Sequence, residues 1–196
     1  MPLWGTSDSD ESKPKNLTTA EKKEVYATNS GWVREAGSIL SGNGNTDADP
    51  EVLVAVSGLA DSIGAADVTE VEWITTTADK SEGFTLSVRV RYNEEVTVTG
   101  SPTIAVTNGN QGSGSGRGPH TLVYASGTGT NELVFSLAIA AANAATNAND
   151  VLSIGAQNVL KPGGATLKDT ADGTTDAAVA ISGAQGTAAG TLTVTA

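Results

Sequence analysis

Apolar and polar residues alternate along most of the chain beyond residue 66. The longest alternation runs from Phe84 to Tyr92, where every second residue is apolar and the residues between them are Thr, Ser or Arg. Successive side chains of a strand point to opposite faces, so this pattern predicts one buried and one solvated face. Shorter segments of the same kind occur at 71–73, 96–98, 104–106, 122–124, 133–139, 151–154, 165–167, 179–181 and 192–194.

These segments predict roughly nine short strands separated by turn residues. Helical periodicity is absent from this part of the sequence. The apolar positions are mainly Val, Leu and Ile, and the whole chain has only three Trp, three Tyr and two Phe. A thin, β-branched core of this kind favours two packed sheets over a helical bundle. The sequence therefore predicts an all-β fold with a β-sandwich.

The first 65 residues follow a different pattern. Thr18 and Glu21 have the spacing of a capping box, which predicts the start of a helix of about two turns. The segment 51–57 predicts a short strand that is apolar on both faces. Glycines interrupt the sequence between these elements, and 57–67 is interpreted as a linker. We therefore predict an extended N-terminal arm over 1–65 and a β-sandwich over 66–196.

The arm contains apolar and aromatic residues that a solvated tail does not need. Trp and Tyr are the residue types that anchor protein interfaces. The arm either folds back over its own sandwich or lies on a neighbouring subunit, and the second alternative makes its apolar residues a partner-binding surface. The candidate partner-binding residues are Leu3, Trp4, Tyr26, Trp32, Val52, Val54 and Val56.

Composition narrows the classes of function. The net charge of the 196-residue chain is −11, with 11 basic residues and no basic run, which argues against nucleic acid as a partner. The absence of cysteine excludes disulfides, thiolate catalysis and Cys-type metal sites. The start of the sequence lacks the pattern of a signal peptide, and no apolar run reaches the ~20 residues that span a bilayer. We expect a soluble protein made in the cytoplasm, with no membrane partner.

Candidate chemistry is sparse. The single histidine, His120, follows a glycine-rich loop and is expected to be a surface residue, because a lone His builds neither a zinc site nor a triad. Glu70 and Glu72 share a strand face without the aromatic cleft of a glycosidase. We predict no enzymatic activity, no cofactor and no metal site. Weak calcium binding stays an alternative for the loop residues Asn147, Asn149, Asp150, Asp169, Asp172 and Asp176.

Three segments of the second part resemble bacterial and phage immunoglobulin-like domains. They are EEVTVTGSPTIAVT (94–107), TLVYASGTGTNELVFSLAIAAANAATNANDVLSIG (121–155) and GGATLKDTADGTTDAAVAISG (163–183). The sequence departs from that family in its long Gly/Ser loop at 109–120 and in the turn at 169–176. The resemblance implies an immunoglobulin-like β-sandwich and little about function, because such domains occur in adhesins, enzymes and viral particles.

The first part is similar to the N-terminal region of structural proteins from marine tailed phages. The shared features are a "WG..D...KPK.L" opening, a "VYAT..GWV" centre and an "E.LVA" strand, which span most of 3–59. This resemblance implies a virion component, with the arm facing the particle and the sandwich displayed outward.

Taken together, these features lead us to expect a virion structural protein, a capsid decoration or cement protein attached through its arm. Its expected partners are the major capsid protein, other virion proteins and copies of itself. A tail, neck or baseplate subunit is the alternative within the same class. A carbohydrate- or receptor-binding module acting through the 109–120 loop is the alternative from another class.

Overall fold

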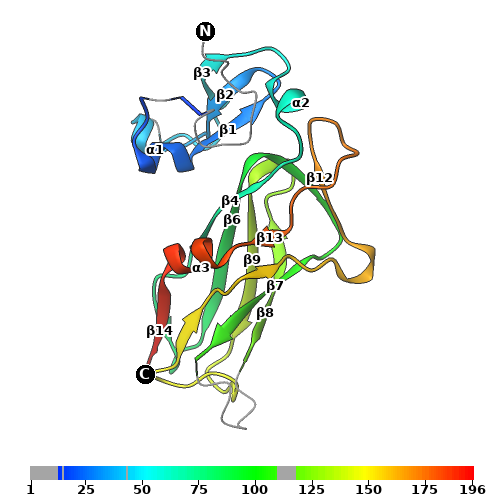
Figure 1. Cartoon of the computed structure of the whole chain (residues 1–196). Coiled ribbons are helices and arrows are strands. Elements are labelled where there is room, and N and C mark those ends of the chain that lie inside the picture. Colours follow the sequence, from blue (N-terminus) through cyan, green and yellow to red (C-terminus); the bar gives the residue numbers. More distant parts are fainter. Residues whose placement is uncertain (1–12, 15, 43, 110–117) are drawn as a thin grey trace.

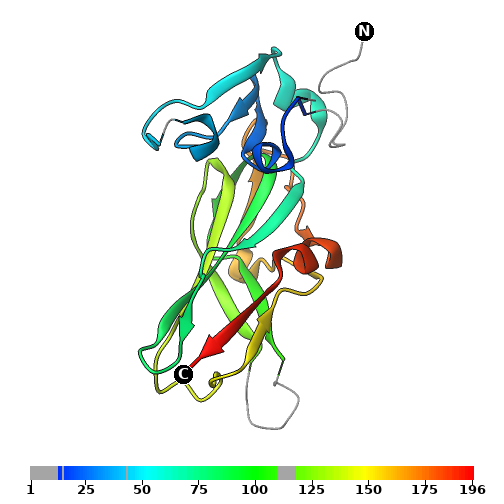
Figure 2. The ribbon, with the colours of Figure 1, turned by 90° about the vertical axis from the view of Figure 1, so that its left-hand side faces the viewer.

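The computed structural model describes residues 13–14, 16–42, 44–109 and 118–196 and is mostly β, which confirms the predicted all-β class. Buried apolar side chains form two separate clusters, one between residues 25 and 63 and the other between residues 66 and 194. Figures 1 and 2 show the two corresponding parts of the chain. A small N-terminal unit (residues 13–63) sits at one end of an elongated body (residues 66–196).

The N-terminal unit is a three-stranded sheet with helical turns beside it. Its strands follow one another antiparallel in the order β3-β2-β1. The capping box predicted at Thr18 and Glu21 is confirmed at the start of α1. The elements are α1 (Thr19–Lys23), β1 (Val25–Thr28), β2 (Gly31–Arg34), the 3-10 turn η2 (Ile39–Ser41), β3 (Glu51–Ala55) and α2 (Leu59–Ile63).

The segment predicted as an extended arm is therefore folded and has a core of its own. Trp32 of β2 packs with Val25, Leu59 and Ile63, and all four side chains are buried. The predicted linker contains α2, whose apolar residues Leu59 and Ile63 lie one turn apart and face the sheet. Gly58 and Gly64 bracket this helix, which is why the sequence suggested a linker.

The body is built around β6 (Phe84–Thr99), a strand of 16 residues. β4 and β9 pair with its first part and β12 with its last part, all antiparallel. From β9 the sheet continues through β8, β7, β10 and β14 to β5. The bounds are β4 (Val68–Trp73), β5 (Ala78–Asp79), β7 (Thr103–Asn108), β8 (His120–Ser126), β9 (Thr130–Ile139), β10 (Val151–Ser153), β12 (Thr166–Asp169) and β14 (Thr191–Thr195).

Two smaller features complete the body. β11 (Gln157–Asn158) and β13 (Ala180–Ile181) form a separate two-stranded sheet, and η3 (Pro162–Gly164) is a single 3-10 turn. Helix α3 (Gly183–Ala189) was not expected from the sequence, because its Gly- and Ala-rich residues carry no apolar period. The capping box of Ser182 and Gln185 is the signal that could have revealed it.

The alternation along β6 behaves as predicted over its first half. Leu86, Val88 and Val90 are buried in the core of the body, while Thr85 is exposed. The sequence suggested two strands here, since the polar residues 93–95 interrupt the pattern. The strand instead continues through them, and its pairing with β9 shifts between Arg91 and Val96.

This polar stretch of β6 is the point of contact with the N-terminal unit. β1 pairs with β6 in parallel, through Ala27 and Glu94. The side chains of Asn93 and Glu94 are buried there. The two hydrophobic clusters share no residue, so polar and charged groups make up much of the boundary between the two parts.

Because each part has its own core, a substitution that destabilises one core should reduce the stability of that part more than that of the other. We expect Trp32→Ala to destabilise the N-terminal unit by about 3–5 kcal/mol, the usual cost of truncating a buried Trp. Hydrogen exchange followed by mass spectrometry should show faster exchange in β1–β3 and unchanged protection in β9. Leu133→Ala, in the buried strand β9, is the matched variant and should have the opposite effect; equal loss of protection in both parts after Trp32→Ala would contradict the two-core description.

Candidate interaction surface

Strand β3 is the outer strand of the N-terminal unit. It pairs with β2 on one side, and no described strand pairs with its other side. Its Val52 is 51% exposed although the residue opposite on β2, Val33, is buried. An unpaired strand edge presents backbone N–H and C=O groups that can pair with another chain.

Further apolar side chains are exposed near the start of this strand. Ile39 is 87% exposed and Leu40 is 47% exposed, both in η2. The turn lies close to β3, because Ser41 and Glu51 line the same shallow hollow. We call Ile39, Leu40 and Val52 the apolar surface of the N-terminal unit. They make up three of the seven large apolar side chains that are strongly exposed in the described part of the chain, where the others are Ile74, Val123, Val151 and Leu160.

The structure separates the predicted partner-binding residues into three groups. Val52 is exposed, as a partner-binding residue requires. Val54 and Val56 are half-buried against the core of the N-terminal unit. Leu3 and Trp4 lie outside the described residues.

Tyr26 and Trp32 require a correction. Both were predicted to contact a partner, but they are 5% and 2% exposed within the chain itself. β1 and β2 pair at Ala27 and Trp32 on one face and at Tyr26 and Val33 on the other. The first face covers the unit's own core. Trp32 belongs to that core, whereas Tyr26 lies on the opposite face, where burial and the nearby charges of Glu95, Glu35 and Glu132 raise the pKa of its hydroxyl. Both aromatic rings are therefore covered within the chain and are not displayed on its surface.

A cluster of charged side chains joins the N-terminal unit to the body, and we call it the Arg91 junction. The Arg91 side chain is only 6% exposed. Its guanidinium group lies 3.0 Å from Glu35, 3.1 Å from Glu72 and 2.5 Å from Glu132. The junction consists of Lys23 and Glu35 from the N-terminal unit and Glu70, Glu72, Arg89, Arg91 and Glu132 from the body.

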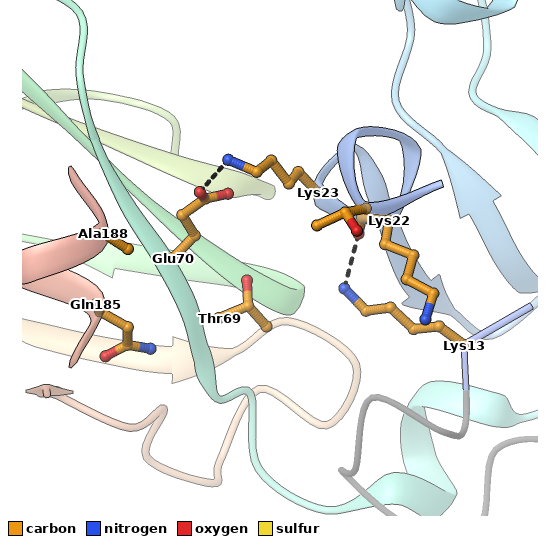
Figure 3. A pocket seen from close by; sticks show the side chains of 8 residues that line it. Lys13, Lys22, Lys23, Thr69, Glu70, Gln185 and Ala188 are labelled. Atoms are coloured by element: carbon orange, nitrogen blue, oxygen red, sulfur yellow. Dashed lines mark hydrogen bonds and ion pairs between the residues drawn. The ribbon is translucent and has the colours of Figure 1, made fainter. Parts of the chain in front are cut away.

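Lys23 crosses the boundary twice. Its ammonium group forms ion pairs with Glu70 and with Glu72, the latter at 3.4 Å. Its backbone oxygen accepts a hydrogen bond from Arg91 at 3.1 Å. Figure 3 shows Lys23 extending from α1 to Glu70 of β4, beside a hollow that Lys22 and Gln185 also line. The paired glutamates of β4, considered above for catalysis, are thus partners of a lysine.

Burial gives the carboxylates of the junction different proton affinities. Desolvation raises the pKa of Glu35 to about 7, against the opposing charge of Arg91, and the nearby Glu132 raises it further. For Glu72 burial acts in the same direction, but Arg91 and Lys23 outweigh it and the pKa lies below its ordinary value. The two pKa values differ because Glu72 has two cations beside it, whereas Glu35 has one cation and a second carboxylate.

His120 lies inside the body and not on its surface, which corrects the expectation from the sequence. It begins β8, is 4% exposed, and its Nε2 lies 3.1 Å from the Oγ1 of Thr146. Burial lowers the pKa of His120, and the charge of Asp150 opposes this effect. The buried His120 ring contacts the hydroxyl of Thr146 and does not open onto a cleft. We therefore assign His120 a structural role.

No group of three or more His, Cys, Asp or Glu residues able to hold a metal ion occurs among the described residues. The acidic loops considered for calcium lie at opposite ends of the body (Figure 1). Asp172 accepts hydrogen bonds from the backbone of Thr174 and Thr175, and Asp150 from Asn108 and Asn147. These carboxylates stabilise turns. No helix in the described ranges is long and apolar enough to cross a bilayer.

Comparison with protein families, with curated proteins and with solved structures gives no significant match. The function therefore has to be argued from the residues of this chain.

The buried charges of the Arg91 junction lead to a prediction about stability. Removing one partner of a buried ion cluster leaves the others uncompensated, which costs about 3–5 kcal/mol. We expect Arg91→Gln to lower the free energy of unfolding by this amount in a urea titration. The exposed pair of Lys161 and Asp176, 3.9 Å apart, provides the control. Lys161→Gln should cost less than about 1 kcal/mol; similar losses for both variants would show that the junction contributes nothing special.

Proposed function

We propose that this chain is a non-enzymatic virion structural protein, a capsid decoration or cement protein attached through its N-terminal unit. The observation that carries the proposal is the partly apolar outer edge of β3, with which no strand of the described residues pairs. The similarity of 3–59 to structural proteins of marine tailed phages supports a particle as the setting. The separate core of the N-terminal unit supports a division of labour, in which one part attaches and the other is displayed.

Attachment by strand addition fits the geometry of this edge. A strand of the neighbouring protein, most simply the major capsid protein, would extend the sheet in the order partner-β3-β2-β1. Val52 and the side chains of η2 would then be covered. The occupant is an apolar strand flanked by basic residues, because Asp47, Asp49 and Glu51 beside this edge are acidic and exposed.

An irregularity in β3 makes this edge selective. The pairing with β2 shifts between Trp32 and Val33, so that Leu53 has no residue opposite it. Such a bulge twists the strand and discourages indiscriminate edge-to-edge pairing. A partner has to match the bulged edge, which favours one specific neighbour over aggregation.

For the body we propose an immunoglobulin-like β-sandwich that is displayed outward. Its single apolar cluster draws residues from β4, β6, β7, β8, β9, β10 and β14, which supports two layers closing over one core. The sequence segments at 94–107, 121–155 and 163–183 support the immunoglobulin-like assignment. The N-terminal unit sits at one end of this body, so attachment there leaves the opposite end free (Figure 2).

The location in the particle can be tested by counting copies. Particles purified from the cells that produce this protein should contain it, and quantitative mass spectrometry should find it in a near-constant ratio to the major shell protein. A handful of copies per particle would move it to the tail, neck or baseplate. Its absence from purified particles would make the virion proposal wrong.

The attachment surface can be tested by placing a charge on it. Val52→Lys should leave the protein folded, because this side chain is already half-exposed, and should abolish co-sedimentation with particles that lack the protein. Val123→Lys is the matched control, since Val123 is 40% exposed on strand β8 of the body. We expect the control to bind like the unaltered protein. Binding by Val52→Lys at an unchanged level would exclude the β3 edge as the attachment site.

A further inference from the structure

In the described part of the chain, the side-chain hydrogen bonds and ion pairs between the N-terminal unit and the body all involve Lys23 or Arg91. The two apolar clusters share no residue, and among the described residues the strands of the two parts pair at Ala27 and Glu94, next to the buried Tyr26. Apart from the connecting chain at 64–67, the firmest contacts across the boundary are those of the Arg91 junction. A boundary of this kind is sensitive to the charge state of its members.

Within the junction, Arg91 is the central group. It extends from β6 and contacts two groups of the N-terminal unit: the backbone oxygen of Lys23 at 3.1 Å and the carboxylate of Glu35 at 3.0 Å. On its own side it contacts Glu72 of β4 and Glu132 of β9. One buried guanidinium group thus fixes the orientation of the small unit on the large one, because its planar donors require fixed acceptor positions.

The charges of the junction balance when one of its carboxyl groups is protonated. The cations are Lys23, Arg89 and Arg91. The carboxyl groups are Glu35, Glu70, Glu72 and Glu132. When Glu35 is protonated, three positive charges face three negative ones. When Glu35 ionises, a fourth negative charge is added beside Glu132, which already shares the guanidinium group of Arg91.

Charged and titratable groups from several elements lie near Glu35. Arg91 of β6 and Glu132 of β9 are the closest, and Tyr26 of β1 also interacts with it. Glu35 also lines a hollow together with Asp49 and Glu51. Arg91 is the only cation in this immediate set, and the remaining charged neighbours are carboxylates that disfavour a further negative charge.

We propose that the Arg91 junction is a latch that holds the N-terminal unit in one orientation on the body and loosens as the pH rises through neutrality. This inference concerns the chain by itself and does not depend on the partner to which it attaches. Glu35 is the group whose ionisation loosens the latch. Arg91 links this ionisation to the boundary, because it contacts both Glu35 and the body.

The direction of the effect follows from the proton affinity of Glu35. Its pKa of about 7 lies above the ordinary value of 4.5, so the folded junction binds this proton more tightly than the unfolded chain does. The stabilisation is fully present below about pH 4.5 and is lost as the pH rises through about 7. Glu72 has a lowered pKa, so its contribution disappears only in acid. Between pH 6 and pH 8 the ratio of protonated to ionised Glu35 falls about a hundredfold.

A distance measurement between the two parts tests the latch. The chain has no cysteine, so labels can be attached at two engineered sites only. Ala20 of α1 and Ala125 of β8 are exposed, and Ala20→Cys with Ala125→Cys places one label on each part. We expect a narrow distance distribution at pH 6 and a broader distribution, or a second population, at pH 8.

Two variants of the labelled protein separate the latch from other effects of pH. Glu35→Gln keeps a neutral side chain of the same shape and should give the narrow distribution at both pH values. Glu82→Gln, an exposed position away from the junction, should behave like the unaltered protein. A distribution that does not change with pH, or a pH dependence that survives in Glu35→Gln, would overturn the proposal. The latter result would point to Glu95, whose pKa burial also raises.

Discussion

The arrangement of the two parts depends on placing the guanidinium group of Arg91 in a nearly water-free position. Removing a cation from water costs several kcal/mol, and this cost is offset only where carboxylates and carbonyl groups replace the lost water. Four such groups, from both parts of the chain, surround Arg91. The N-terminal unit supplies two of them, so the burial of Arg91 is complete only when that unit is in place. A hydrophobic contact of equal area would tolerate sliding, whereas this contact specifies one orientation.

Strand β6 couples this interaction to both cores. Its first half carries Leu86, Val88 and Val90 into the core of the body, and Arg91 follows directly. The next residues leave the ladder with β9, and Glu94 pairs with β1. A single continuous strand therefore serves as a core element, as the carrier of the buried charge and as the contact point of the second unit. The register shift at 91–96 permits this change of partner, because it frees the strand from β9 where β1 approaches.

The sequence predicted the body better than the N-terminal unit, and the reason is physical. Alternation is a local signal, and it identifies strands such as 133–139 wherever one face is buried. Burial through tertiary contacts leaves no such signal. Arg91 occupies a position that the alternation marks as solvated, and His120 follows a glycine-rich loop, yet both are buried by residues distant in the sequence. Trp32 and Tyr26 were predicted to contact a partner, but the structure buries both within the chain, Trp32 in the core of its own unit. Val52 was predicted as a partner-binding residue because its strand is apolar on both faces, and the structure leaves this side chain half-exposed.

The topology also determines what a loosened latch would change. In the order β3-β2-β1-β6, β3 is the strand farthest from the point where the N-terminal unit meets the body. A rotation about the contact of β1 with β6 therefore moves β3 more than the strands between them. The apolar surface of Ile39, Leu40 and Val52 lies at this outer end, so its direction relative to the body is the quantity that the Arg91 junction controls. A rigid orientation favours simultaneous attachment at regularly spaced sites, since each protein then presents its edge at the same angle. The buried charge of Arg91 and the exposed edge of β3 are thus linked, because the orientation that Arg91 holds determines the direction in which this edge points.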